Sequence, residues 1–168
     1  INEEGYDAVF IGSGAGLPKF MGIPGEQANG VFSANEFLTR NNLMKAFRDD
    51  YDTPIHQGKK VAVIGGGNVA IDVSRTAVRC GSPKVTQVSL ETRDIMPALP
   101  EEIELAESEG IAFAGGWGPK EILTENGKVT GIVFKKCTQV KNAEGRFDPK
   151  YDENETMTIA CSNVILSV

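Results

Sequence analysis

The sequence is poor in the residues that build metal sites, redox pairs and disulfide frameworks. Its 168 residues include one histidine, His56, and three cysteines, Cys80, Cys137 and Cys161. The cysteines are odd in number and far apart, so they form neither a disulfide framework nor a CxxC motif. We therefore predict a reducing, cytoplasmic setting, no metal site, and a surface-loop position for His56, which has no second histidine or cysteine nearby.

A basic excess and a long apolar run are also missing. The chain carries 17 Lys and Arg against 23 Asp and Glu, which gives a net charge of −6. Nucleic acids and anionic membrane surfaces bind basic faces, so neither is expected as a partner. No apolar run reaches the length of a membrane span. A hydrophobic content of 40% in a chain of this length predicts one domain with a core of its own.

Glycine is abundant, and one glycine cluster has the surroundings of a dinucleotide site. An apolar strand over residues 60–64 leads directly into Gly65, Gly66, Gly67, Asn68, Val69 and Ala70. A helix starts near Asn68 and ends at Cys80–Gly81. Gly65 permits a tight turn, Gly67 leaves room for a pyrophosphate, and Ala70 lets the helix pack closely on the strand. The helix N-terminus attracts phosphates.

A carboxylate follows at the position suited to a ribose. The second strand, residues 85–90, ends on Glu91, which can accept hydrogen bonds from the adenosine ribose. The alternative is a glycine-rich turn followed by an ordinary surface glutamate. The order strand, turn, helix, strand, acid favours the cofactor site.

An earlier glycine cluster, residues 12–16, follows a predicted strand over Tyr6 to Ile11. Leu17–Pro18 stands where a helix should begin, so a sharp connection is the favoured interpretation. The backbone amides of Gly12 and Gly14 are nevertheless candidate ligand contacts.

The remaining patterns complete an α/β fold. Ser33 is expected to cap a helix, with Glu36 reaching back and an apolar face made by Phe37, Leu38, Leu43, Met44 and Phe47. An acidic helix is predicted over Pro100 to Glu109 and a strand over residues 111–114.

Alternation then predicts antiparallel strands over residues 121–124, 128–136 and 155–160, with a hairpin turn at Asn126–Gly127. Residues 140–154 are expected as a long exposed loop or a hairpin tip. We predict a Rossmann-like domain with a central parallel sheet, helices on one side and a small antiparallel β-meander on the other. The chain opens without methionine and ends within a predicted strand, Val164 to Val168, so we expect a fragment of a longer protein.

Residues 6–25 and 30–38 resemble the glutamate synthase small (beta) subunit family, and the similarity continues through most of the chain. Relatives of that family include the ferredoxin-NADP transhydrogenase large subunit and the flavin-binding portion of dihydropyrimidine dehydrogenase. The later matching positions are Gly58 to Val61, the glycine loop, Asp72, Arg75 to Ala77, Met96 to Ala98 and Glu101–Glu102.

The resemblance implies one NAD(P)-binding domain, residues 1–168, inserted into the FAD domain of a flavoprotein. Residues 1–20 and 162–168 would be crossover segments to that FAD domain. Hydride would pass from NAD(P)H to FAD and on to iron–sulfur centres, with the FAD domain and an iron–sulfur or large catalytic subunit as partners. The cofactors perform this chemistry, so we expect no catalytic residue here, no FAD bound by this chain, and no activity from it alone.

One position departs from the family. Members that use NADP typically carry an Arg-Arg pair where this chain has Leu90–Glu91. A carboxylate repels a 2′-phosphate and two guanidiniums are lost, so we expect NAD(H) to be preferred. NADP(H) stays possible because Arg75, Arg79 and especially Arg93 are within reach of the adenosine end.

Two alternatives remain beside this interpretation, and a third is excluded. A non-catalytic NAD-sensing or scaffold domain would share the same loop, and an S-adenosylmethionine methyltransferase would share the loop and the acid. Thioredoxin reductase would need a CxxC pair, which is absent.

Trp117 is expected to cover the sheet, or else to pack at the rim of the nicotinamide end.

Overall fold

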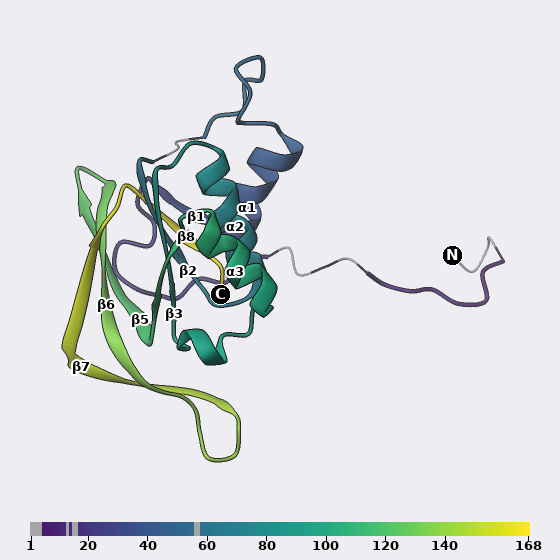
Figure 1. Cartoon of the computed structure of the whole chain (residues 1–168). Helices are drawn as coiled ribbons and strands as arrows, with labels where there is room; N and C mark the ends of the chain where they lie inside the picture. The colour runs from purple at the N-terminus through teal and green to yellow at the C-terminus, as the bar shows by residue number, and fades with distance from the viewer. Residues whose placement is uncertain (1–4, 13, 15–16, 56–57) are drawn as a thin grey trace.

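A five-stranded parallel sheet in the order β1-β8-β2-β3-β4 forms the centre of the molecule (Figure 1). The computed structural model describes residues 5–12, 14, 17–55 and 58–168. The strands are β1 (Val31–Ser33), β2 (Lys60–Ile64), β3 (Lys84–Ser89), β4 (Ala112–Gly115) and β8 (Asn163–Leu166). Their carboxyl ends therefore lie along one edge.

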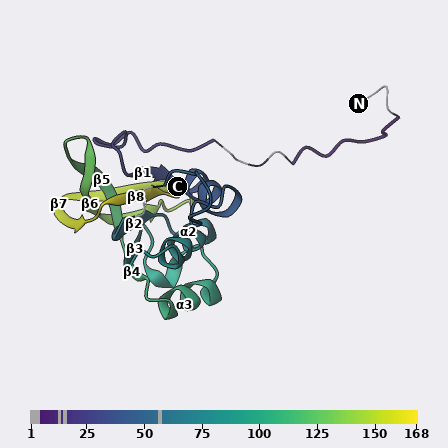
Figure 2. The same ribbon diagram turned by 90° about the horizontal axis from the view of Figure 1, so that it is seen from above.

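Helices cover one face of this sheet and an antiparallel sheet covers the other (Figure 2). The helices are α1 (Ala34–Leu38), α2 (Asn68–Arg79) and α3 (Pro100–Ser108). The antiparallel sheet consists of β5 (Trp117–Glu125), β6 (Lys128–Lys141) and β7 (Phe147–Ala160). The predicted fold class, a parallel sheet between helices and a small β-meander, is confirmed.

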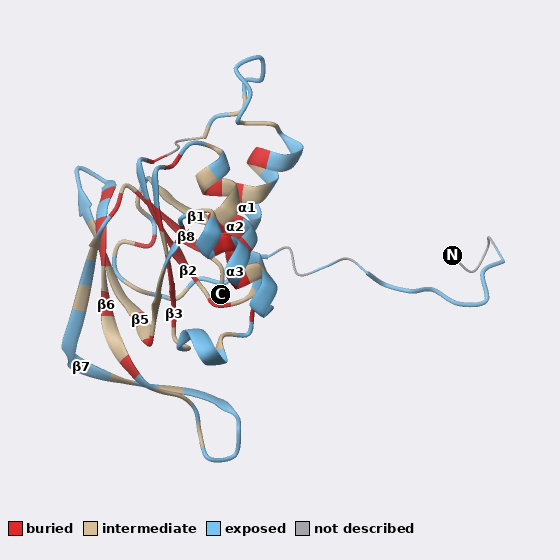
Figure 3. Ribbon diagram, in the orientation of Figure 1, coloured by how far each residue is buried: buried red, intermediate tan, exposed pale blue. Residues whose placement is uncertain are grey.

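Alternation along the strands explains why both faces of the parallel sheet are buried (Figure 3). In β2, Val61 and Val63 pack in the cluster with the helices, whereas Ala62 and Ile64 pack in the cluster with the antiparallel sheet. Successive side chains of a strand point to opposite faces. A strand apolar at every position is therefore buried on both sides, as the sequence predicted for β2.

β2, β3, β4, α2 and α3 lie within one or two residues of their predicted bounds. The antiparallel strands β5, β6 and β7 are longer than predicted, by four to eight residues at one end, and the short strand β1 was not predicted. Gly81 and Gly110 have φ angles of +98° and +88° after α2 and α3, a conformation that ends a helix readily only at glycine. Asn126 and Gly127, with φ angles of +50° and +74°, form the expected tight turn between β5 and β6.

The predicted strand over Tyr6 to Ile11 is wrong. These residues form no strand, and Phe10 and Ile11 are 95% and 83% exposed. Figure 1 shows this N-terminal segment leading away from both sheets. A β-type sequence becomes a strand only where a neighbouring strand accepts its hydrogen bonds, and none of the described strands does so here.

The first helix also differs from its prediction. Ser33 Oγ accepts from the Glu36 N–H at 3.2 Å as expected, but the Glu36 carboxylate pairs with Arg40 instead of reaching back. The α-helix ends at Leu38, and a π-helical turn, Thr39–Leu43, follows.

This change of helix type moves the apolar face. Phe37 is buried, but Leu43, Met44 and Phe47 are exposed. Buried Asn41 faces the interior instead, where its Nδ2 donates to Phe37 O at 2.9 Å and its Oδ1 accepts from Cys80 Sγ at 3.3 Å.

Of the two possibilities for residues 140–154, the hairpin is the one observed. β6 and β7 extend into this region, and the turn is closed by Asn142, whose N–H donates to Arg146 O at 2.9 Å.

None of the helices in the described part of the chain has the length and apolar character needed to span a membrane.

Candidate functional site

The glycine loop joins the carboxyl end of β2 to the start of α2. Gly65 has a φ of +145°, and a Cβ there would lie 2.3 Å from the main-chain oxygen of Ser167 and 3.3 Å from Ala70 Cβ. Only glycine fits this position. At Gly67 a Cβ would meet nothing within 4 Å, so this residue, the N-cap of α2, presents open backbone to a ligand.

Buried polar contacts fix the loop. The Gly65 N–H donates to Val88 O at 2.9 Å, and Gly66 O accepts from the Ala98 N–H at 3.0 Å. Gln87, 1% exposed in the middle of β3, donates from Nε2 to Gly65 O. Ser74 on α2 donates to the Gln87 side chain in turn. Sequence reasoning missed Ser74 and Gln87, although a glutamine within an apolar strand was the available signal.

Two hollows lie on either side of this loop. The large hollow, about 580 Å³, is lined by Gly65, Gly66, Glu91, Trp117 and Tyr151, among others. The small hollow, about 360 Å³, is lined by Gly67, Asn68 and Val69, with Ser33 to Asn35 opposite. A ligand that crosses the glycine loop therefore has a cavity for each of its ends.

Glu91 projects into the large hollow, as its position after β3 predicted. Its Oε2 lies 3.0 Å from where a Cβ on Gly66 would stand. Its main-chain oxygen accepts from Ser89 Oγ at 2.8 Å and from the Gly116 N–H at 3.2 Å. These contacts hold the strand end, so the carboxylate stays beside the loop.

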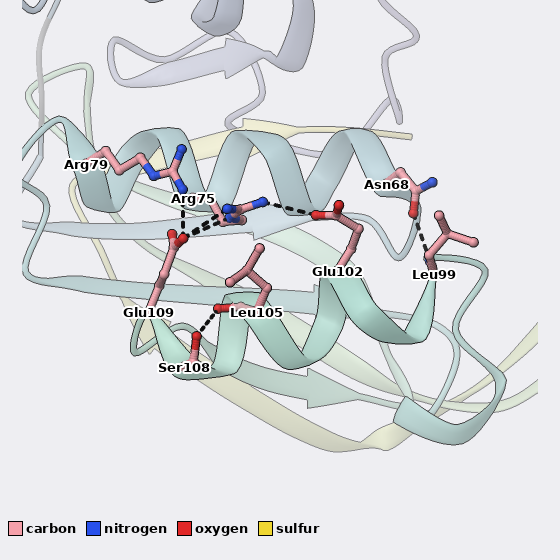
Figure 4. A network of polar contacts seen from close by, with 8 residues as sticks. All are labelled: Asn68, Arg75, Arg79, Leu99, Glu102, Leu105, Ser108 and Glu109. Atoms are coloured by element: carbon pink, nitrogen blue, oxygen red, sulfur yellow. Dashed lines mark hydrogen bonds and ion pairs between the residues drawn. The ribbon is translucent and has the colours of Figure 1, made fainter.

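The nearby arginines are engaged with acidic residues of α3 and the residue after it (Figure 4). Arg75 pairs with Glu102 and Glu109, both at 3.0 Å, and Arg79 pairs with Glu109 at 2.7 Å. The Arg75 and Arg79 guanidiniums lower the pKa of the Glu109 carboxyl, with the Arg75 hydrogen bond the largest cause. Neither arginine lines either hollow.

Arg93 is held in the same manner. It begins a short 3₁₀ turn, Arg93–Ile95, and its guanidinium grips Glu107 with two hydrogen bonds of 2.7 Å. Hydrogen bonding between the two side chains lowers the pKa of the Glu107 carboxyl and raises the pKa of the Arg93 guanidinium. The structure therefore pairs Arg93 with Glu107 of α3, and Arg93 is not among the residues that line the large hollow.

Asn68, Val69 and Ala70 form the first turn of α2, but their side chains differ in role. Asn68 Oδ1 accepts from the Leu99 N–H at 2.9 Å (Figure 4), which ties the helix start to α3. Val69 is 49% exposed beside the small hollow, and Ala70 is fully buried against the sheet.

Gly12 and Gly14 are not brought to the loop. Both are exposed in the N-terminal segment, and neither lines either hollow. His56 lies outside the described residues.

Trp117 lines the large hollow and also packs against the core cluster under the antiparallel sheet. The Lys136 ammonium stands 4.6 Å from its ring centroid. Trp117 therefore lies on the Glu91 side of the glycine loop and not on the side of the small hollow.

The cysteines are buried or half-buried free thiols. Burial raises the pKa of Cys161 to about 11, which leaves it an unreactive thiol at neutral pH. Among the described residues, no three His, Cys, Asp or Glu side chains gather in a way that could hold a metal ion.

Several curated proteins are similar to this chain. The glutamate synthase [NADPH] small chain of Halomonas elongata is 37% identical over 98% of the chain, and that of Escherichia coli is 37% identical over 84%. The NADPH-Fe(3+) oxidoreductase subunit beta of Geobacter sulfurreducens is 33% identical over 97%. The chain spans only 35%, 31% and 24% of these three relatives. The predicted resemblance to glutamate synthase small subunits is confirmed.

Solved structures share the fold. Mycobacterium tuberculosis FprA in complex with NADPH matches 99% of the chain and 51% of its own length, with a TM-score of 0.69 at 20% identity. Thioredoxin reductase of T. acidophilum matches 90% of the chain and 41% of its own length, with a TM-score of 0.63 at 17% identity. Residues 2–168 match the family described as pyridine nucleotide-disulphide oxidoreductase, and the chain belongs to that family.

Proposed function

We propose that this chain binds a nicotinamide dinucleotide across the glycine loop. The pyrophosphate lies against Gly67 and the first turn of α2, the adenosine occupies the large hollow, and the nicotinamide end reaches the small hollow. One observation carries the proposal: the open backbone at Gly67 lies between two cavities at the carboxyl edge of a parallel sheet. Ligands of open α/β sheets bind at this edge.

Glu91 is the ribose contact in this arrangement. Its carboxylate is beside Gly66, where it can accept hydrogen bonds from the hydroxyls of an adenosine ribose. Gly12 and Gly14 lie away from the loop and stay predictions only.

We further propose a preference for NAD(H) over NADP(H). Glu91 stands where a 2′-phosphate would project, and Arg75, Arg79 and Arg93 are paired with glutamates of the α3 region. The relatives named above are NADPH enzymes, which supports the opposite preference. The preference for NAD(H) rests on Glu91 in the large hollow and on the absence of Arg75, Arg79 and Arg93 from the described residues that line it.

The function proposed for the whole protein is hydride transfer from the nicotinamide to FAD, and from there to iron–sulfur centres. An FAD domain of the same polypeptide and an iron–sulfur or large catalytic subunit are its partners, in a reducing cytoplasm. Residues 1–20 and 162–168 are the proposed crossovers to the FAD domain. Support comes from family membership and from similarity to subunits of multi-component oxidoreductases.

Titration with NADH and NADPH tests the nucleotide assignment. Tighter binding of NADH supports the stated preference, tighter binding of NADPH reverses it, and binding of neither overturns the site. The 168-residue chain alone should bind NADH without oxidising it, since no flavin is present to accept the hydride. Oxidation of NADH by the chain alone would contradict the proposal that this chain only binds the nucleotide.

A further inference from the structure

Lys19 lies on the rim shared by the two hollows. Among the described residues, only three line both cavities, namely Lys19, Ser167 and Val168. Ser167 and Val168 follow β8, and the Ser167 N–H donates to Ile64 O at 2.8 Å beside the glycine loop. Lys19 therefore stands at the passage from one hollow to the other, where a ligand that occupies both must cross.

The Lys19 ammonium is uncommitted within the described part of the chain. No carboxylate lies within ion-pair distance of it there, and its side chain is exposed. The other lysine that lines the large hollow, Lys135, is bound to Glu153 at 2.7 Å and lies over the Tyr151 ring. No Asp or Glu side chain is among the described residues that line the small hollow with Lys19.

A free cation at this point meets an electrostatic need of the site. The chain has a net charge of −6, and Glu91 adds a negative charge inside the large hollow. The loop itself offers only neutral N–H groups. A phosphate approaching such a surface is repelled unless a nearby cation offsets the charge.

We propose that Lys19 binds the pyrophosphate of the dinucleotide, opposite the glycine loop. The inference rests on the proposed nucleotide site and adds a contact from outside the strand–loop–helix unit. The segment before β1 then becomes part of the binding site. An ammonium–phosphate contact of this kind is charge-assisted and stronger than a neutral hydrogen bond.

The test compares ligands that differ in their phosphates, in the full-length protein. ADP-ribose carries the pyrophosphate, whereas adenosine carries none. In Lys19→Met we expect ADP-ribose to bind about tenfold more weakly, the scale of one lost charged hydrogen bond, with adenosine unchanged. Lys19→Arg should keep most of the affinity, because a cation remains. Raising the salt concentration should weaken ADP-ribose binding less in Lys19→Met than in the wild type.

Lys84→Met is the matched control. Lys84 is also exposed, but it begins β3 at the opposite edge of the sheet, so ADP-ribose affinity should not change. The inference is overturned if Lys19→Met, shown by circular dichroism to be folded, binds ADP-ribose as tightly as Lys84→Met. A wild-type protein that binds neither ADP-ribose nor NADH overturns the proposed function itself, and the Lys19 contact with it.

Discussion

The side-chain amide of Gln87 donates a hydrogen bond of 3.0 Å to the main-chain oxygen of Gly65. The same side chain accepts from Ser74 Oγ at 3.0 Å. A buried contact thus links the first glycine of the loop to β3 and to α2. Gln87 and Ser74 thus fix the glycine loop from the protein interior, and neither lines the two hollows.

Replacing Gln87 with leucine should destabilise the protein and loosen the loop. Gly65 O and Ser74 Oγ lose their partner in the interior, and a buried polar group without a partner costs about 1–3 kcal/mol. Urea unfolding should show this loss, and NADH should bind more weakly. Gln27→Leu, at an exposed position, is the control and should leave both quantities unchanged. Equal stability of the two variants would contradict the role given to Gln87.

Alanine at Gly65 should lower the stability of the protein, whereas alanine at Gly67 should lower its affinity for NADH. In Gly65→Ala the new methyl group meets the Ser167 oxygen and the φ angle is unfavourable, so the melting temperature should fall, with a cost of about 2 kcal/mol or more. In Gly67→Ala the methyl group has free space, so stability should change little. The same methyl group would stand between the backbone and a pyrophosphate, and NADH affinity should fall.

This pair separates folding from binding at two positions of one loop. If Gly67→Ala binds NADH with unchanged affinity, the pyrophosphate does not approach the backbone there.

Glu91→Gln should weaken NADH binding about tenfold, since ribose hydroxyls lose a charged acceptor. NADPH binding should be unchanged or tighter, because the repulsion of its 2′-phosphate is relieved. Dissociation constants for both nucleotides give the result. Glu101→Gln, on the exposed side of α3, should alter neither. A parallel loss for both nucleotides would show that Glu91 does not discriminate between them.

The Glu109 carboxylate should make stability depend on acid pH. Arg75 and Arg79 lower its pKa in the folded protein, so its stabilising contribution is complete above the ordinary pKa of a glutamate. That contribution is lost as the pH falls through the lowered value. Glu109→Gln should therefore cost about 1 kcal/mol at pH 7 and reduce the fall in unfolding free energy between pH 7 and pH 3. An unchanged acid profile would mean that the ion pairs contribute nothing measurable.

The glycine loop and Glu91 were predictable because their meaning is local. Turn, helix start and strand end follow one another along the chain, so spacing alone places Gly65, Ala70 and Glu91 together. The contact between Gln87 and Gly65 lies within the same strand–loop–helix–strand unit, but it depends on the Gln87 side chain pointing into the buried layer between β3 and α2. Only the folded structure shows this direction.

Contacts between distant elements were not predictable in the same way. Arg75 was a candidate ligand contact until the packing of α2 on α3 placed it beside Glu109. The failed strand at Tyr6 to Ile11 has a similar cause. Local sequence gives a preference for extended backbone, but a strand exists only where another strand is available to bond to it.

The position of β8 has a consequence for the order in which the molecule assembles. β8 follows every other strand in the sequence, yet it lies between β1 and β2 and pairs with both. While the ribosome is still making the second half of the domain, β2, β3 and β4 can already associate, but β1 has no neighbour in the parallel sheet. Closure of a loop of more than 120 residues, from Ser33 to Asn163, is then the late step.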